Sequence, residues 1–121
     1  MATTVSPQAS PLSQRIVKET ALAATVVLNV TGASGSWWSL DIDNSANGHI
    51  TYVRVWDNLD PTNGTTDPDW IVSVDSNERR IIVAPEGAVF ALGLSMAAVR
   101  DAGTAGTTAP AGAVIVQLVT S

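Results

Sequence analysis

The chain has 121 residues, a length typical of a single domain, and a net charge of −5 at pH 7 with only six basic residues. So few cations argue against nucleic acid as a ligand, because binding it requires a basic surface that neutralises phosphates. The chain has no cysteine, which excludes disulfides, zinc–thiolate sites and thiol chemistry.

The composition is apolar and poor in charge. Hydrophobic residues make up 45% of the chain and charged residues 14%, whereas soluble domains average about 25% charged residues. Two explanations stay open: part of the surface is buried against a partner, or Ser, Thr and Asn coat a compact β-domain. No run approaches the roughly 18–20 apolar residues of a membrane span, and the N-terminus lacks the basic start and apolar core of a secretion signal. We therefore expect no membrane contact.

The N-terminal region is predicted to lie outside the domain. Residues 1–14 are rich in Ser, Thr, Pro and Gln and cannot bury enough apolar area to fold alone. We expect an extended arm over residues 1–18, ending in a charged hinge, and one domain over residues 19–121. The arm is either a disordered tail or a segment laid on a neighbouring subunit, and we adopt the second interpretation. It places three residues of this region in an interface: Pro7, Pro11 and Arg15.

Hydrophobic runs separated by turn clusters predict about seven or eight short strands. This pattern is typical of an antiparallel β-sandwich of the jelly-roll or immunoglobulin-like type. Pro85 is expected to end one strand, because proline has no N–H for the ladder, and Gly93 to kink or divide another. The expected strands cover residues 21–30, 36–42, 49–56, 70–74, 79–84, 88–100 and 113–120.

The chain has four tryptophans, which we expect to be divided between core and surface. Alternation over residues 36–42 places Trp37 on the outer side of its strand. The same alternation turns three side chains inward: Trp38, Leu40 and Ile42. We expect Trp37, and one of Trp56 or Trp70, to lie near the surface, where they would anchor a protein interface or stack on a sugar.

Residues 49–56 carry large apolar groups on both faces, as expected of a central strand. A loop over residues 57–69, rich in Asp, Asn, Pro and Gly, joins them to residues 70–74, so the two runs predict a long-looped hairpin. Aspartates in this loop match no ordered calcium-binding sequence and are better explained as turn formers. The aspartates concerned are Asp57, Asp60, Asp67 and Asp69.

No group of residues indicates catalysis. His49 is the only histidine, and Asp41 or Asp43 could orient it across a turn as a general base. A packed or exposed turn histidine is the favoured interpretation, and no G-x-S-x-G nucleophile elbow is present. We therefore expect a protein that is not an enzyme and that has no catalytic residue, metal site or cofactor.

One resemblance covers residues 50–119. It begins with an aromatic strand, YVRVWD at residues 52–57, and the loop PTNGT at residues 61–65. A PEG turn at residues 85–87, LGL at residues 92–94 and a Gly/Thr-rich loop at residues 103–108 follow. This series of strands and turns resembles small structural proteins of tailed bacteriophages.

The resemblance implies a virion component with a β-sandwich fold, foremost a capsid decoration (cement) protein that is assembled in the host cytoplasm. Its partners would be the major capsid protein or other virion proteins, and symmetric shells favour a closed homo-oligomer, here expected to be a trimer. Two alternatives stay open: a tail, fibre or baseplate domain that binds host carbohydrate, and an enzyme accessory module. Together with Trp37, four loop residues are predicted to contact the partner: Asp60, Pro61, Asn63 and Asp67.

Overall fold

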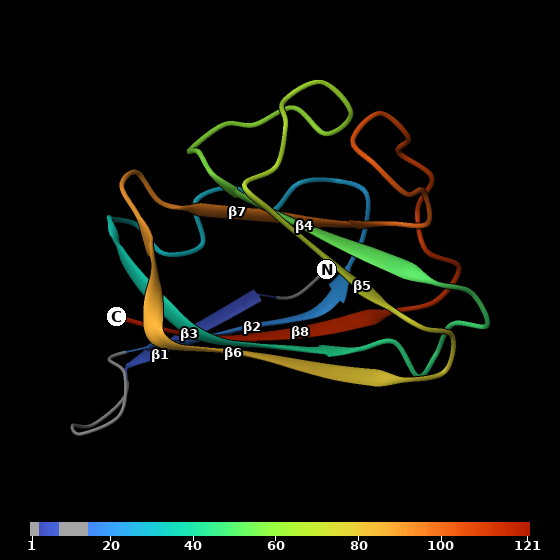
Figure 1. Ribbon diagram of the computed structural model, residues 1–121, viewed down its shortest axis with the longest axis horizontal. Coiled ribbons are helices and arrows are strands. Elements are labelled where there is room, and N and C mark those ends of the chain that lie inside the picture. The colour runs from blue at the N-terminus through green and yellow to red at the C-terminus, as the bar shows by residue number, and fades with distance from the viewer. Residues whose placement is uncertain (1–2, 8–14) are drawn as a thin grey trace.

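The computed structural model describes residues 3–7 and 15–121, and these residues form eight strands and no helix. Two antiparallel sheets pack face to face, which confirms the predicted all-β sandwich (Figure 1). One sheet has the order β1-β2-β8-β3-β6 and the other the order β5-β4-β7. The strands are β1 Thr3–Pro7, β2 Arg15–Leu22, β3 Gly35–Asp43, β4 Thr51–Asp57, β5 Trp70–Val74, β6 Arg79–Phe90, β7 Leu94–Val99 and β8 Val114–Thr120.

The N-terminal region contributes two strands to the five-stranded sheet. β1 pairs antiparallel with β2, and β2 pairs with β8, with Val17 opposite Leu118. The structure therefore differs from the expected arm over residues 1–18, because the boundary falls inside β2. The physical reason is burial: Val17 is fully enclosed, and an arm outside the domain would expose it to water.

Two of the three interface residues predicted in this region lie where β1 ends and β2 begins. Pro7 is the last residue of β1 and stands opposite Arg15 in the ladder. The Arg15 guanidinium donates a hydrogen bond to the Thr31 carbonyl. Pro11 lies outside the described residues, so its predicted role stays a prediction.

The expected strand over residues 21–30 is wrong in its position. β2 begins at Arg15 and ends at Leu22, and the chain then runs beside β7 as a loop with one bridge, Val27 to Met96. Asn29 adopts a positive φ of 48°, a conformation that no strand residue takes and that asparagine tolerates. The loop shields the outer edge of β7, which lies at one side of the three-stranded sheet.

β3 carries a bulge that reverses the predicted orientation of its tryptophans. On β8, Thr120 stands opposite Trp37 and Val119 opposite Ser39, so Trp38 is one extra residue. The bulge turns Trp37 into the core, where only 4% of its surface is exposed. Its ring meets that of Trp70 edge to face at 5.8 Å. The prediction that Trp37 faces outward is therefore wrong, whereas Leu40 and Ile42 face inward as predicted.

β6 continues through Pro85, which corrects the expected stop. Opposite the bulge, β3 residues Trp37 and Ser39 pair with Ala88 and Val83, so four residues of β6 have no partner there. β6 is the edge strand of its sheet, and an edge accommodates a proline that lacks an N–H.

The remaining predicted strands agree with the structure. The long-looped hairpin is present as β4 and β5, and Gly93 lies between β6 and β7 as the predicted break. β4 is the central strand of its sheet and is covered on both sides, because Val53 and Val55 join the core while Arg54 and Trp56 are buried on the opposite face.

Candidate functional site

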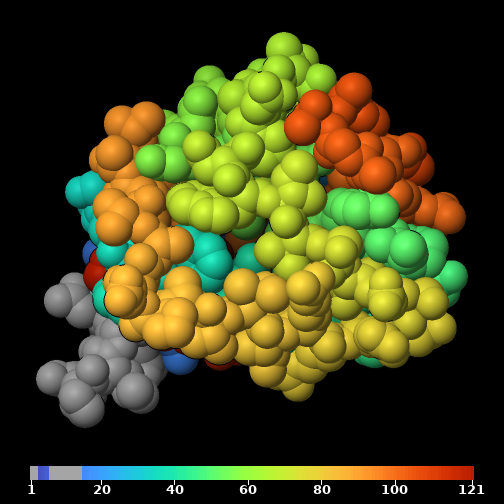
Figure 2. All heavy atoms as spheres, in the orientation of Figure 1, coloured from blue at the N-terminus to red at the C-terminus, as the bar shows by residue number. Residues whose placement is uncertain are grey.

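The outer face of the three-stranded sheet is covered by two loops, residues 58–69 and 100–113, which lie side by side in Figure 2. Their contact is close: a Cβ on Gly64 would come within 2.9 Å of the Ala105 carbonyl oxygen. Gly64 has a φ of +87°, which glycine adopts without strain. The loops therefore form a fixed layer over the sheet.

Arg54 is the buried centre of this layer. Its guanidinium donates to Asn63 Oδ1 at 2.6 Å and to the Gly103 carbonyl at 2.9 Å. Asn63 Nδ2 in turn donates to the Ala24 carbonyl at 2.8 Å. Burial lowers the pKa of Arg54, and the nearby Asp101 carboxylate opposes this shift. One side chain thus joins three separate segments of the chain.

The four predicted contact residues of the first loop occupy different positions. Pro61 is buried and Asn63 is half-buried, and the Asn63 amide is bonded within the domain. Asp60 and Asp67 are exposed. Only these two of the four present their side chains fully to solvent.

Two of the four loop acids, Asp57 and Asp69, accept backbone N–H groups at least 12 residues away in the chain, so they do not form the local turns expected of them. Desolvation raises the pKa of Asp57, but N–H donors from Ala91, Leu92 and Gly93 outweigh it, so that the pKa lies below its usual value. Asp69 accepts the backbone N–H of Asp57 at 2.7 Å. Across the described residues, no group of three or more His, Cys, Asp or Glu side chains is placed to hold a metal ion.

His49 is held in a turn. Its Nε2 accepts the Ala111 N–H at 3.2 Å, and its Nδ1 lies 2.9 Å from the Ile50 carbonyl, so Nδ1 is the nitrogen that donates. Both ring nitrogens therefore contact backbone. Asp41 and Asp43, which could have oriented the ring, instead bond to Arg79 and to the Ser45 N–H.

The outer face of the five-stranded sheet is different, since no element of the described chain packs over it (Figure 1). Strand pairing arranges the side chains of this face in two rows that each cross β2, β8, β3 and β6. One row runs Ile16, Val119, Ser39 and Val83, and the next runs Lys18, Gln117, Asp41 and Ile81. A third, shorter row holds Ile115, Asp43 and Arg79. We call this surface the outer face.

Apolar side chains are prominent on the outer face. Val83 is 63% exposed, Ile81 57% and Ile115 36%. A solvated sheet face is ordinarily polar, and exposed apolar clusters rimmed by polar groups mark protein contacts. The outer face is therefore the candidate site for contact with another protein.

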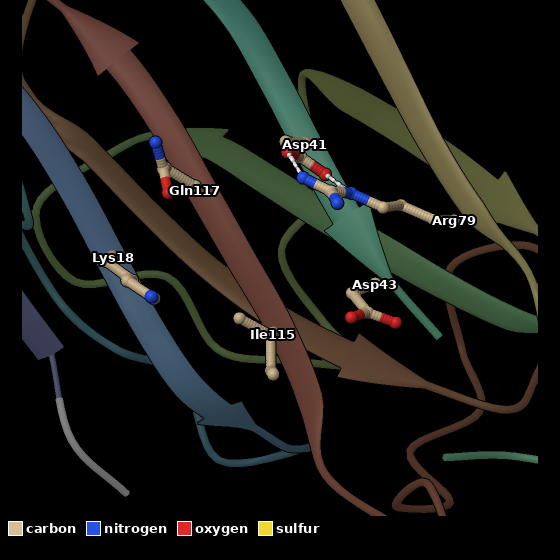
Figure 3. A pocket seen from close by; sticks show the side chains of 6 residues that line it. All are labelled: Lys18, Asp41, Asp43, Arg79, Ile115 and Gln117. Carbon is tan, nitrogen blue, oxygen red and sulfur yellow. Dashed lines mark hydrogen bonds and ion pairs between the residues drawn. The ribbon is translucent and has the colours of Figure 1, made fainter. Parts of the chain in front are cut away.

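The centre of the outer face is a polar hollow of about 190 Å³. Figure 3 shows Lys18 on one side of β8, and Asp41 and Asp43 on the other, with Arg79 reaching Asp41 from β6. The Arg79 guanidinium donates two hydrogen bonds to the Asp41 carboxylate, one of them 2.8 Å from Nε to Oδ1. This pairing raises the pKa of Arg79, and hydrogen bonds from Ser45 lower the pKa of Asp43.

Lys18 differs from the other three charges of the hollow. Within the part of the chain that the structure describes, no acceptor is bonded to its ammonium group. Asp41 lies two strands away, across Gln117, a separation of about 10 Å between strand axes. Two cations and two carboxylates leave the hollow without net charge, although the whole chain carries −5.

The outer face was not predicted from the sequence, although a signal was present. Residues 81–84 are apolar at every position, so one of their two faces must point away from the core.

The tryptophans do not form an exposed platform: Trp37 and Trp56 are buried, and the Trp56 ring N–H donates to the Thr66 carbonyl at 2.9 Å.

Comparison of the chain with family models, with curated proteins and with solved structures finds no match in any of the three. None of the described residues belongs to a helix long and apolar enough to span a membrane.

Proposed function

We propose that the protein is a non-enzymatic structural component of a tailed-bacteriophage virion, and specifically a capsid decoration protein that reinforces the head shell. The motifs between residues 52 and 108 support this through their resemblance to phage structural proteins. The jelly-roll or immunoglobulin-like chain path and the closed homo-oligomer are parts of the same proposal.

The observation that carries the proposal is the outer face. It gives an acidic domain one partly apolar surface whose charges cancel, of the kind that two proteins bury when they associate. Burying the exposed part of a side chain such as Ile81 or Val83 contributes about 1–2 kcal/mol. Repeated over a shell, such contacts add stability without any chemistry at the site.

The fixed loop layer supports the same function. Binding costs free energy when loops must be ordered on contact. Here the bonds of Arg54, Asn63 and Trp56 hold the loops before any partner arrives. A domain ordered in advance suits a protein whose role is to reinforce an assembly.

The carbohydrate-binding alternative has no supporting observation. Its principal candidate, Trp37, is buried against Trp70, so stacking on a sugar would require the core to open. We therefore retain the decoration role alone.

Quantitative mass spectrometry of purified phage particles tests the proposal. A decoration protein is expected at a copy number comparable to that of the major capsid protein, and on heads that lack tails. A few copies per particle, confined to tails, would replace it with a tail protein. Absence from purified particles would overturn every virion role.

A further inference from the structure

We propose that the occupant of the outer face is a second copy of this chain, bound face to face about a two-fold axis that runs along β8. This inference rests on the proposed function, because it names the partner of the surface that carries it. It concerns contacts between copies, for which it replaces the trimer expected from the resemblance with a dimer, and the bond to the shell is a separate contact.

Charge is the first argument. Two molecules of a −5 chain repel each other, and a self-association surface must therefore avoid like charges. The hollow on the outer face has two cations and two carboxylates, so two copies can approach there without net repulsion.

The arrangement of those charges is the second argument. Lys18 lies on the β2 side of β8, and Asp41 lies on the β3 side in the same row. A 180° rotation about an axis parallel to β8, between the two facing sheets, exchanges the β2 side and the β3 side of that strand. It keeps every residue in its own row. Each Lys18 then faces Asp41 of the other copy, and the pair forms twice.

A two-fold axis perpendicular to the strands that crosses the row of Lys18 is disfavoured, because it would set Lys18 against Lys18. Packed sheets lie about 10 Å apart with strands within about 30° of parallel. This distance suits a long side chain such as lysine reaching a carboxylate on the facing sheet.

The β8 side chains on the axis are the third argument. They face their own equivalents, so each must be compatible with itself. Ile115 and Val119 are apolar and pack against their copies. Gln117 lies between them, and its amide has both donors and an acceptor, so two such amides can bond to each other. A single charged residue on this line would prevent the contact.

The apolar residues of β6 are also covered in this arrangement. β1 and β6 are the two edges of the sheet, so the rotation brings each β6 over the partner's β1. Ile81 then faces the row position of Thr4, which pairs with Lys18. The exposed apolar surface of Ile81 and Val83 leaves water as the dimer forms.

Charge reversal provides a direct test with purified full-length protein, free of particles. Sedimentation equilibrium of the wild-type protein is expected to give a dimer. Lys18→Asp sets carboxylate against carboxylate, and Asp41→Lys sets ammonium against ammonium. Each variant alone is expected to dimerise at least about tenfold more weakly, since facing like charges are strongly unfavourable.

Mixing the Lys18→Asp and Asp41→Lys variants is the decisive arm. In the mixed dimer the carboxylate introduced at position 18 of one copy faces the ammonium group introduced at position 41 of the other, and the second pair is wild-type. Both attractive pairs are present, so the mixture is expected to form a heterodimer of near wild-type affinity. The matched controls are Arg100→Asp and Asp60→Lys, which change the charge equally at exposed residues away from the outer face.

Three outcomes would overturn the inference: a wild-type monomer at millimolar concentration, a wild-type trimer, or two variants that dimerise poorly and are not rescued by mixing. Circular dichroism of both variants confirms that they are folded. A monomer that is nevertheless abundant on purified heads would refute the dimer and leave the decoration role standing.

Discussion

Individual polar side chains fix the loops of this domain by bonding to backbone atoms. Four side chains form hydrogen bonds to segments that are distant in sequence: Arg54, Asn63, Asp57 and Asn44. Asn44 Nδ2 donates to the carbonyl oxygens of His49, Val74 and Asp75, for example. Buried polar groups of this kind are costly to leave unpaired, so they select one loop conformation.

Arg54→Met is expected to destabilise the domain by about 2–3 kcal/mol. Methionine fills much of the space but leaves Asn63 Oδ1 and the Gly103 carbonyl without their donor. Urea unfolding measures the loss, and limited proteolysis should show earlier cleavage in residues 58–69. Arg100→Met, at an exposed position, is the control. Equal stability of the two variants would show that the Arg54 bonds hold nothing.

Asp57→Ala is expected to cost about 2–3 kcal/mol at pH 7, because three backbone N–H groups lose a charged acceptor. The folded pKa of Asp57 lies below its usual value. Its contribution is therefore present above the unfolded value of about 3.9 and is lost as the pH falls through the folded pKa.

Urea unfolding of wild type and Asp57→Ala at pH 7 and at about pH 2.5 checks this dependence. The difference between the two proteins should shrink in acid. Asp60→Ala, whose exposed carboxylate lies in the same loop, should match wild type at both values. A difference that does not change with pH would contradict the assigned role of the carboxylate.

At the scale of elements, the period-two pattern predicted most of the strands and the long hairpin, because strands buried on one or both faces repeat their side chains in that way. It failed at Trp38, since one extra residue in a bulge reverses the phase without leaving a mark in composition. It also failed over residues 21–30, where β-branched residues predict a strand and nothing in the composition signals the positive φ of Asn29.

The outer face was not predicted because its residues belong to four different strands. Lys18, Asp41 and Ile81 become neighbours only through the order β2-β8-β3-β6, and a single sequence does not give strand order. The role of Arg54 was hidden for the same reason, because its acceptors lie in two loops that meet only in the folded domain.

Removing residues 1–14 is expected to leave a folded sandwich that is less stable by about 1–3 kcal/mol. β1 pairs only with β2, and its Val5 is 48% exposed, so little apolar area is lost. β2 keeps its ladder with β8. Thermal unfolding followed by circular dichroism tests this, and complete unfolding of the truncated chain would show that β1 is essential to the core.

The whole molecule is a sandwich with two different outer surfaces. One sheet lies beneath a fixed layer of loops, and the other exposes its strands around a hollow that has no net charge. This asymmetry is the basis of the proposed role in a virion, and it makes the bare sheet the surface on which assembly should depend.

Cryo-electron microscopy of purified heads tests this central claim most directly. We expect density for the domain on the outside of the shell, with the outer face of the five-stranded sheet buried against a second copy and Lys18 beside Asp41 of that copy. A domain bound to the shell with this face open to solvent, or heads that carry no such density, would contradict it.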